Sequence, residues 1–106
     1  MEEENQNPPE TGITVEHDPV GQKFTAEVDG KTNVLAYTEV NDTWDIFEVA
    51  VDEGVRGRGI GEQLALAAFR HAVQHNIKII PSCPYIKDAF LEKYPEFKEI
   101  TTNSFY

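Results

Sequence analysis

A glycine-rich run with two arginines is the segment whose residue types best suit anion binding. It reads Arg56-Gly57-Arg58-Gly59-Ile60-Gly61 and stands between a stretch of alternating apolar residues and a stretch of helical periodicity. Absent side chains let backbone N–H groups approach a phosphate, and the first N–H groups of a helix have no internal partner. The helix dipole and the two guanidinium groups would add positive charge. The alternative is a flexible glycine turn with two solvated arginines.

Two better-known phosphate motifs do not match this run. A P-loop ends in Gly-Lys followed by Ser or Thr, whereas this run ends in Gly61 and continues with Glu62. A dinucleotide-binding fold places its glycine loop after the first strand, whereas four strands are expected to precede this one. The run therefore predicts an anion site of another kind at the start of a helix.

The one cysteine, Cys83, stands between a short β-branched run and Pro84, which is placed to begin a helix. A thiol at a helix N-terminus ionises more readily and is more nucleophilic, so Cys83 is a candidate catalytic residue. The alternative is a buried cysteine that acts as a small apolar side chain. A single cysteine can form no disulfide within the chain and cannot supply a thiolate zinc site.

Three further residues are weaker candidates for proton transfer. Asp45 and Glu48 lie in the strand-like run 44–51 and could serve as general bases, although acids on a strand more often face solvent. Tyr85 could donate a proton to a leaving thiolate, but an aromatic residue at such a position more often packs in a core.

Two histidines, His71 and His75, stand one helical turn apart, which is the spacing of a metal-binding pair. No third ligand is evident, so no metal site is predicted, and both are expected at a solvated helix end. His17 has no companion motif.

The elements that must position these residues follow from hydrophobic periodicity and turn signals. Alternation and turns such as Asp29-Gly30 predict four strands in an antiparallel meander. Helical spacing after the glycine run puts Val73 on an apolar face and both Gln63 and His71 on a polar face. A strand, loop, helix and strand in succession predict a parallel crossover. The expected strands are 13–17, 23–29, 33–40, 44–51 and 77–80, and the expected helices run from 60 to 75 and from 84 to at most 94.

Composition narrows the classes of partner. The chain of 106 residues carries 19 acidic and 9 basic residues, a net charge of −10. This argues against nucleic acid or an anionic membrane surface as a partner, because both need a basic footprint. No stretch approaches the ~20 apolar residues of a membrane span, and no signal-peptide pattern is present. We expect an intracellular, cytoplasmic protein with an acidic disordered tail at 1–10 and one domain at 11–106.

The glycine run resembles the pyrophosphate-binding motif R/Q-x-x-G-x-G/A of the GNAT acetyltransferase superfamily. The lead-in Val49–Arg56 is similar to the strand that precedes this motif. Two downstream segments, Pro81–Tyr85 and Tyr94–Phe97, resemble those of minimal stand-alone GNAT-like proteins. The resemblance runs from about Phe24 to Phe97. It implies an α/β fold whose mostly antiparallel mixed sheet is splayed after the fourth strand and carries two main helices.

The resemblance implies acetyl-CoA as the ligand and an acetyl-CoA-dependent N-acetyltransferase as the activity. Backbone amides of 56–62 would hold the pyrophosphate, the main chain of 49 and 51 would pair with the pantetheine arm, and Cys83 would be a catalytic residue near the thioester. Two routes stay open: acetylation of Cys83 followed by transfer, or direct attack by an amine. The cofactor-binding residues so implied are Val49, Val51, Arg56, Gly57, Arg58, Gly59, Ile60, Gly61, Glu62, Cys83 and Tyr85.

Two departures from the superfamily pattern fall on the acceptor side. Only Asp18–Gln22 joins the first two strands where a full GNAT domain has two helices, and the strands after the last helix are shortened or absent. The sequence therefore supports acyl-CoA binding more firmly than acetyl transfer. We expect an unidentified amine acceptor, with the acidic surface favouring a cation. The alternative is a CoA-binding or protein-interaction module without catalysis.

Overall fold

The computed structural model describes residues 13–106, and the tail expected at 1–10 lies outside them. A five-stranded sheet holds its strands in chain order, with β1 to β4 antiparallel and β5 parallel to β4. The expected meander and parallel crossover are confirmed. The first strand is shorter than expected, because it begins at Glu16, after the buried residues Ile13 and Val15. The strands are β1 (Glu16–Asp18), β2 (Lys23–Val28), β3 (Lys31–Val40), β4 (Thr43–Ala50) and β5 (Lys78–Pro81).

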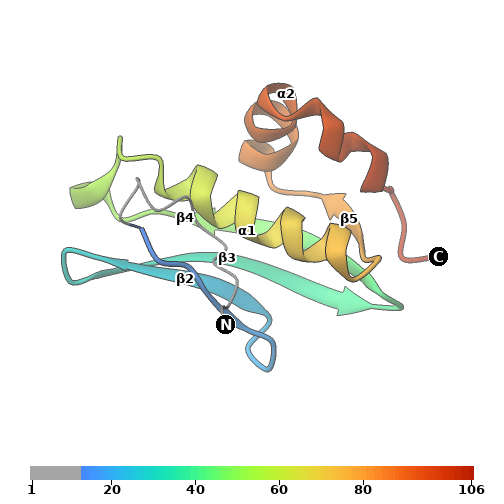
Figure 1. Cartoon of the computed structure of the whole chain (residues 1–106), viewed down its shortest axis with the longest axis horizontal. Coiled ribbons are helices and arrows are strands. Elements are labelled where there is room, and N and C mark those ends of the chain that lie inside the picture. Colours follow the sequence, from blue (N-terminus) through green and yellow to red (C-terminus); the bar gives the residue numbers. More distant parts are fainter. Residues whose placement is uncertain (1–12) are drawn as a thin grey trace.

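One long helix, α1 (Ile60–Gln74), covers one face of the sheet (Figure 1). Alternate strand residues point toward it, because successive side chains of a strand face opposite ways. Their burial removes large apolar surfaces from water, which is the main favourable contribution to folding. The strand residues of this core include Phe24, Leu35, Tyr37, Trp44 and Ile46.

The buried face of α1 is rotated relative to the face expected from periodicity. Val73, expected in the core, is 50% exposed, whereas Gln63, expected on the polar face, is 8% exposed. The helix α1 is covered on two sides. The sheet packs beneath it, and a C-terminal segment packs beside it, where the rings of Phe69 and Phe90 lie 5.0 Å apart.

This C-terminal segment is helical from residue 84 to residue 93, as Pro84 predicts. Its middle is a π-helical turn, η3 (Ile86–Phe90), followed by a short α2 (Leu91–Lys93). The expected end at or before Tyr94 is confirmed, and Pro95 begins a further 3₁₀ stretch, η4 (Pro95–Ile100). We call residues 84–100 the C-terminal arm. Figure 1 shows it above β5, the edge strand of the sheet.

After the arm, the chain returns to the free edge of β5. Thr101 forms a parallel bridge with Ile79, and the N–H of Thr102 donates to the Ile79 carbonyl at 2.8 Å. Within residues 13–106, the chain after the arm adds this bridge to the sheet and forms no further strand. No helix in that range is long and apolar enough to cross a membrane.

Candidate functional site

Strands β4 and β5 separate part of the way along β4. They pair from Thr43 and Lys78 up to Ile46 and Pro81. The N–H of Cys83 then donates to the Ile46 carbonyl at 2.9 Å, and beyond this bond β4 continues to Ala50 paired with β3 but not with β5. The splay expected after the fourth strand is therefore present, and Cys83 stands where it begins.

Cys83 also occupies the expected place at the start of the C-terminal arm. Its carbonyl accepts the N–H of Lys87 at 3.0 Å, an i to i+4 bond of the first helical turn. Its side chain is 5% exposed and belongs to the hydrophobic core. The local backbone geometry is thus that of a residue preceding a helix, while the thiol itself is buried.

A β-bulge in β4 redirects the side chains that follow it. Ile46 pairs with Tyr37 and Glu48 pairs with Ala36, so Phe47 is the extra residue. Because a bulge shifts the alternation by one residue, Ile46 and Val49 face the same side of the sheet. The sequence reading missed this bulge. Its signal is the change of phase in the apolar positions 44, 46, 47, 49 and 51.

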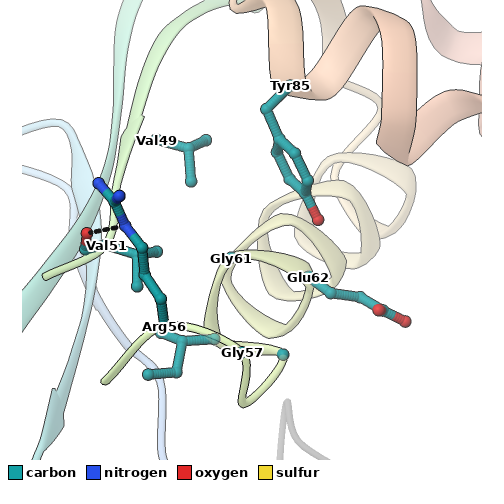
Figure 2. A pocket seen from close by; sticks show the side chains of 9 residues that line it. Val49, Val51, Arg56, Gly57, Gly61, Glu62 and Tyr85 are labelled. Carbon is teal, nitrogen blue, oxygen red and sulfur yellow. Dashed lines mark hydrogen bonds between the residues drawn. The ribbon is translucent and has the colours of Figure 1, made fainter. Parts of the chain in front are cut away.

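A cavity of about 420 Å³ opens beside the part of β4 that has no β5 partner, between the glycine loop, the start of α1 and the C-terminal arm (Figure 2). Every residue that lines it is one that the resemblance assigned to the cofactor. The structure does not bring Arg58 and Cys83, also assigned, into this lining. The lining residues are Val49, Val51, Arg56, Gly57, Gly59, Ile60, Gly61, Glu62 and Tyr85.

The middle of the cavity is a slot between Val49 and Tyr85, with Gly61 at its floor (Figure 2). A Cβ atom at Gly61 would lie 3.6 Å from Cγ1 of Val49 and 3.7 Å from the Tyr85 ring. The glycine at position 61 therefore keeps this space open, although no left-handed φ angle requires a glycine there. Burial raises the pKa of the Tyr85 hydroxyl, and the nearby Glu62 and Cys83 raise it further. Tyr85 is consequently a protonated, hydrogen-bond-donating group at neutral pH.

The start of α1 forms one end of the cavity. Gly57 and Gly59 have φ angles of 87° and 76°, a left-handed backbone that favours glycine. The first intrahelical bond runs from the Gln63 N–H to the Gly59 carbonyl at 3.0 Å. The three preceding helical N–H groups have no intrahelical partner, and the N-cap Gly59 offers no side chain to cap them. An anion can bind there to backbone donors and to the positive end of the helix dipole.

The two arginines of the glycine run point to different places. Arg56 lines the cavity, and its Nε donates to the Val51 carbonyl at 3.2 Å (Figure 2). Arg58 instead forms an ion pair with Asp29 in the β2–β3 turn, with 2.8 Å between Nη2 and Oδ2. Of the two arginines, only Arg56 is a lining residue of the cavity.

A carboxylate sits in the first turn of α1 and is held by the C-terminal arm. Glu62 accepts a bond from Lys93 Nζ at 3.1 Å and another from the Tyr94 hydroxyl. The Tyr94 bond is the main reason that the pKa of Glu62 is lowered, with Lys93 adding to the effect. The same bond raises the pKa of Tyr94 to about 12. Sequence reading did not predict these contacts, because 31 residues separate Glu62 from Lys93.

Asp45 and Glu48, the candidate bases, do not line the cavity. Asp45 pairs in register with Ile80 and is partly buried, with Oδ1 lacking a hydrogen-bond partner among the described residues. Glu48 is exposed beside the bulge. The residues that pair with Asp45 and Glu48 in β3 alternate with Tyr37 and Leu35, which are buried beneath α1. Both acidic side chains therefore lie on the opposite face of the sheet, away from α1.

The histidines form a different arrangement from the one expected. His71 is half-buried rather than exposed: its ring stacks on Trp44 at 5.3 Å and meets His17 edge-on at 4.7 Å. Burial, followed by the neighbouring His75 and His17, lowers the pKa of His71 to about 4. His75 is exposed, as expected. No three His, Cys, Asp or Glu side chains within residues 13–106 are placed to hold a metal ion.

Comparison with known proteins places this geometry among acetyltransferases. Residues 23–100 match the family model of the GCN5-related N-acetyltransferases. The protein NATD1 of Xenopus tropicalis is 34% identical over 95 residues, covering 86% of this chain and 87% of the relative. Human NATD1 is 34% identical over 91 residues, covering 82% and 80%.

A solved structure has the same fold. It is the solution structure of a GCN5-like protein from Staphylococcus aureus, proposed to be an N-acetyltransferase. The TM-score is 0.64 at 26% identity, with 85% of this chain and 88% of the other covered. Residues 23–100, which the family model matches, include the glycine loop, the splayed strands and the C-terminal arm.

Proposed function

Because the chain belongs to the GCN5-related N-acetyltransferase family, we propose that it binds acetyl-CoA in the cavity beside β4 and transfers the acetyl group to an amine. The observation that carries this proposal is the composition of the cavity: its lining consists wholly of residues that the family resemblance assigns to the cofactor. When bound, acetyl-CoA supplies an activated acetyl group as a thioester.

The residues present fit this ligand along its length. The free N–H groups at the start of α1 and the Arg56 guanidinium suit the pyrophosphate. Val49 and Val51 offer apolar surface to the pantetheine arm, and β4 beyond Ile46 has no strand on its β5 side. An extended, amide-bearing ligand can bind such an edge as an added strand does. The open space over Gly61 admits a narrow chain rather than a bulky group.

The thioester is proposed to lie near Cys83, because Cys83 stands where β4 and β5 separate. Both chemical routes use this placement. In the covalent route the Cys83 thiolate takes the acetyl group first, and in the direct route an amine attacks the thioester while Cys83 is a neighbour. The thiol is 5% exposed and outside the cavity lining, which favours the direct route in this conformation. Tyr85 is positioned in the lining to donate a proton to a leaving thiolate.

The acceptor is proposed to be an amine, and a cation is favoured by the net charge of −10. A second candidate function is a CoA-binding or protein-interaction module without catalysis. One observation favours it: residues 19–22 alone connect β1 to β2, so no helices shape an acceptor pocket there. The cytoplasmic location and the extent of the single domain, 11–106, stay predictions.

Isothermal titration of the folded chain with acetyl-CoA and with CoA tests the proposed ligand. We expect both to bind, and we expect Gly59→Asp to abolish binding, because it adds a negative charge at the start of α1. Absence of binding at millimolar ligand would overturn the proposal. Thioester consumption across a panel of amines then separates the two functions. Binding of CoA without any thioester loss would select the non-catalytic module.

A further inference from the structure

An acidic side chain in the cavity lining needs an explanation if that cavity holds phosphates. Glu62 is in the first turn of α1, beside the N–H groups proposed to bind the pyrophosphate, and its side chain is 26% exposed. A carboxylate there repels a phosphate and cancels the charge of Arg56, the single cation of the lining. With these two groups alone, the lining would have a net charge of zero.

The C-terminal arm brings a second cation to this end of the cavity. Lys93 Nζ lies 3.1 Å from Glu62 Oε1, and it also lies 5.8 Å from the centre of the Tyr94 ring. Tyr94 donates to the other carboxylate oxygen, so Glu62 is held from both oxygens. An ammonium group has three donors, and Glu62 uses one of them. The Lys93 side chain is 64% exposed, so its remaining donors are accessible to a ligand.

We propose that Lys93 is a further phosphate-binding residue, which Glu62 and Tyr94 hold at the start of α1. This inference rests on the proposed function, since it takes the ligand to be a CoA ester. In this arrangement Glu62 is a positioning residue: it fixes the ammonium group of Lys93 beside the helix N-terminus. Counting Lys93 together with the lining residues Arg56 and Glu62 gives the cavity and its rim a net charge of +1 in a chain of −10.

The anchoring of the arm makes this placement specific to Lys93. Tyr94 packs on Phe90 at 4.9 Å, and Phe90 packs in turn on Phe69 of α1 at 5.0 Å. Lys93 is therefore attached to a segment that is itself fixed to α1. Lys98, on the same arm, forms its ion pair with Glu92 at 3.7 Å, and Glu92 is not a residue that lines the cavity. It is a natural control for the charge of the arm.

The experiment compares Lys93→Ala with Lys98→Ala by isothermal titration, using CoA and pantetheine as probes. We expect Lys93→Ala to weaken CoA binding by about three- to tenfold, and to weaken pantetheine, which has no phosphate, by less than about twofold. Lys98→Ala should match the wild type with both probes. The affinity of Lys93→Ala for CoA should also fall less steeply with added salt, because one screened attraction is gone.

Two further variants test the positioning role and guard against loss of structure. Lys93→Arg, which keeps the charge, should retain most of the CoA affinity. Tyr94→Phe should weaken CoA binding by a smaller factor than Lys93→Ala, with thermal unfolding confirming that each variant is folded. Equal CoA affinity of Lys93→Ala and the wild type would overturn the assignment of Lys93 alone. Failure of the wild type to bind CoA would overturn the proposed function itself.

Discussion

Arg58 is paired with Asp29, 2.8 Å from Nη2 to Oδ2, although the arginine belongs to the glycine run and the aspartate to the β2–β3 turn. Arg56, two residues earlier, lines the cavity instead. The two arginines look equivalent in the sequence motif. In the folded chain, Arg56 lies in the cavity lining and Arg58 binds the neighbouring β2–β3 turn.

We therefore expect the two arginines to differ in their effect on CoA binding. Arg56→Ala should weaken affinity by about tenfold, because it removes a charge-assisted contact inside the cavity. Arg58→Ala should change affinity by less than about twofold, since an exposed ion pair contributes little. Calorimetric titration of both variants provides the check. Equal losses would mean that Arg58 leaves Asp29 when the ligand binds.

Gly61 provides a test of the slot between Val49 and Tyr85. An alanine there makes ordinary contacts of 3.6–3.7 Å in the free protein, so Gly61→Ala should keep or raise the unfolding free energy, by up to about 1 kcal/mol. The same methyl group occupies ligand space, and CoA affinity should fall by about fivefold or more.

Gly30 gives the opposite pattern and serves as the control. Its φ of 77° is strained for alanine, but nothing within 4 Å of its Cβ position belongs to the cavity. Gly30→Ala should cost about 1 kcal/mol of stability and leave CoA affinity unchanged. Thermal unfolding and titration together measure both quantities. If Gly61→Ala bound CoA as the wild type does, the ligand would not pass over Gly61.

Cys83 distinguishes the two chemical routes. Because its thiol is buried, we expect intact mass measurement after mixing with acetyl-CoA to show no acetyl adduct. Cys83→Ala should then retain turnover within about threefold once the variant is shown to be folded. The contrary result, an adduct that disappears together with turnover in Cys83→Ala, would establish the covalent route.

His71 predicts a pH-dependent stability. Its folded pKa of about 4 lies below the ordinary value of 6.5, so the unfolded chain binds more protons between these values. The free energy of unfolding must then fall as pH drops from about 6.5 toward 4. Glu39 opposes the lowering of the His71 pKa. The pKa of His17 is also lowered by burial, and Asp18 opposes that shift. We expect urea midpoints to be lower at pH 5 than at pH 7.

Substituting the histidines tests whether His71 causes the loss of stability between pH 7 and pH 5. His71→Gln should lose less stability than the wild type between pH 7 and pH 5, by about 1 kcal/mol. His75→Gln should retain most of the loss, because burial, the first cause of the low pKa of His71, is unchanged. An identical pH dependence in wild type and His71→Gln would contradict the prediction.

Much of this protein could be read from its sequence, because the relevant forces act over a few residues. Alternation in 23–40 specified two strands, the positive φ angles of Gly57 and Gly59 required glycine, and Pro84 and Pro95 marked real boundaries. The anion site at the start of α1 was foreseen for the same reason, whereas the other lining residues of the cavity were implied by the family resemblance. A glycine run at a helix start exposes backbone donors wherever it occurs.

Tertiary structure decided what depends on neighbours distant in the chain. Gln63 is buried and Val73 is exposed on a helix that packs against the arm as well as the sheet. Arg56 and Arg58 have different partners because of contacts that the folded chain makes. The same is true of the bonds that Lys93 and Tyr94 donate to Glu62. These contacts join residues that are 5 to 32 positions apart in the sequence. Periodicity cannot register such contacts, because an ion pair or ring stack leaves no repeating pattern. The sequence by itself determined where an anion could bind, and only the folded chain decided which charges surround it.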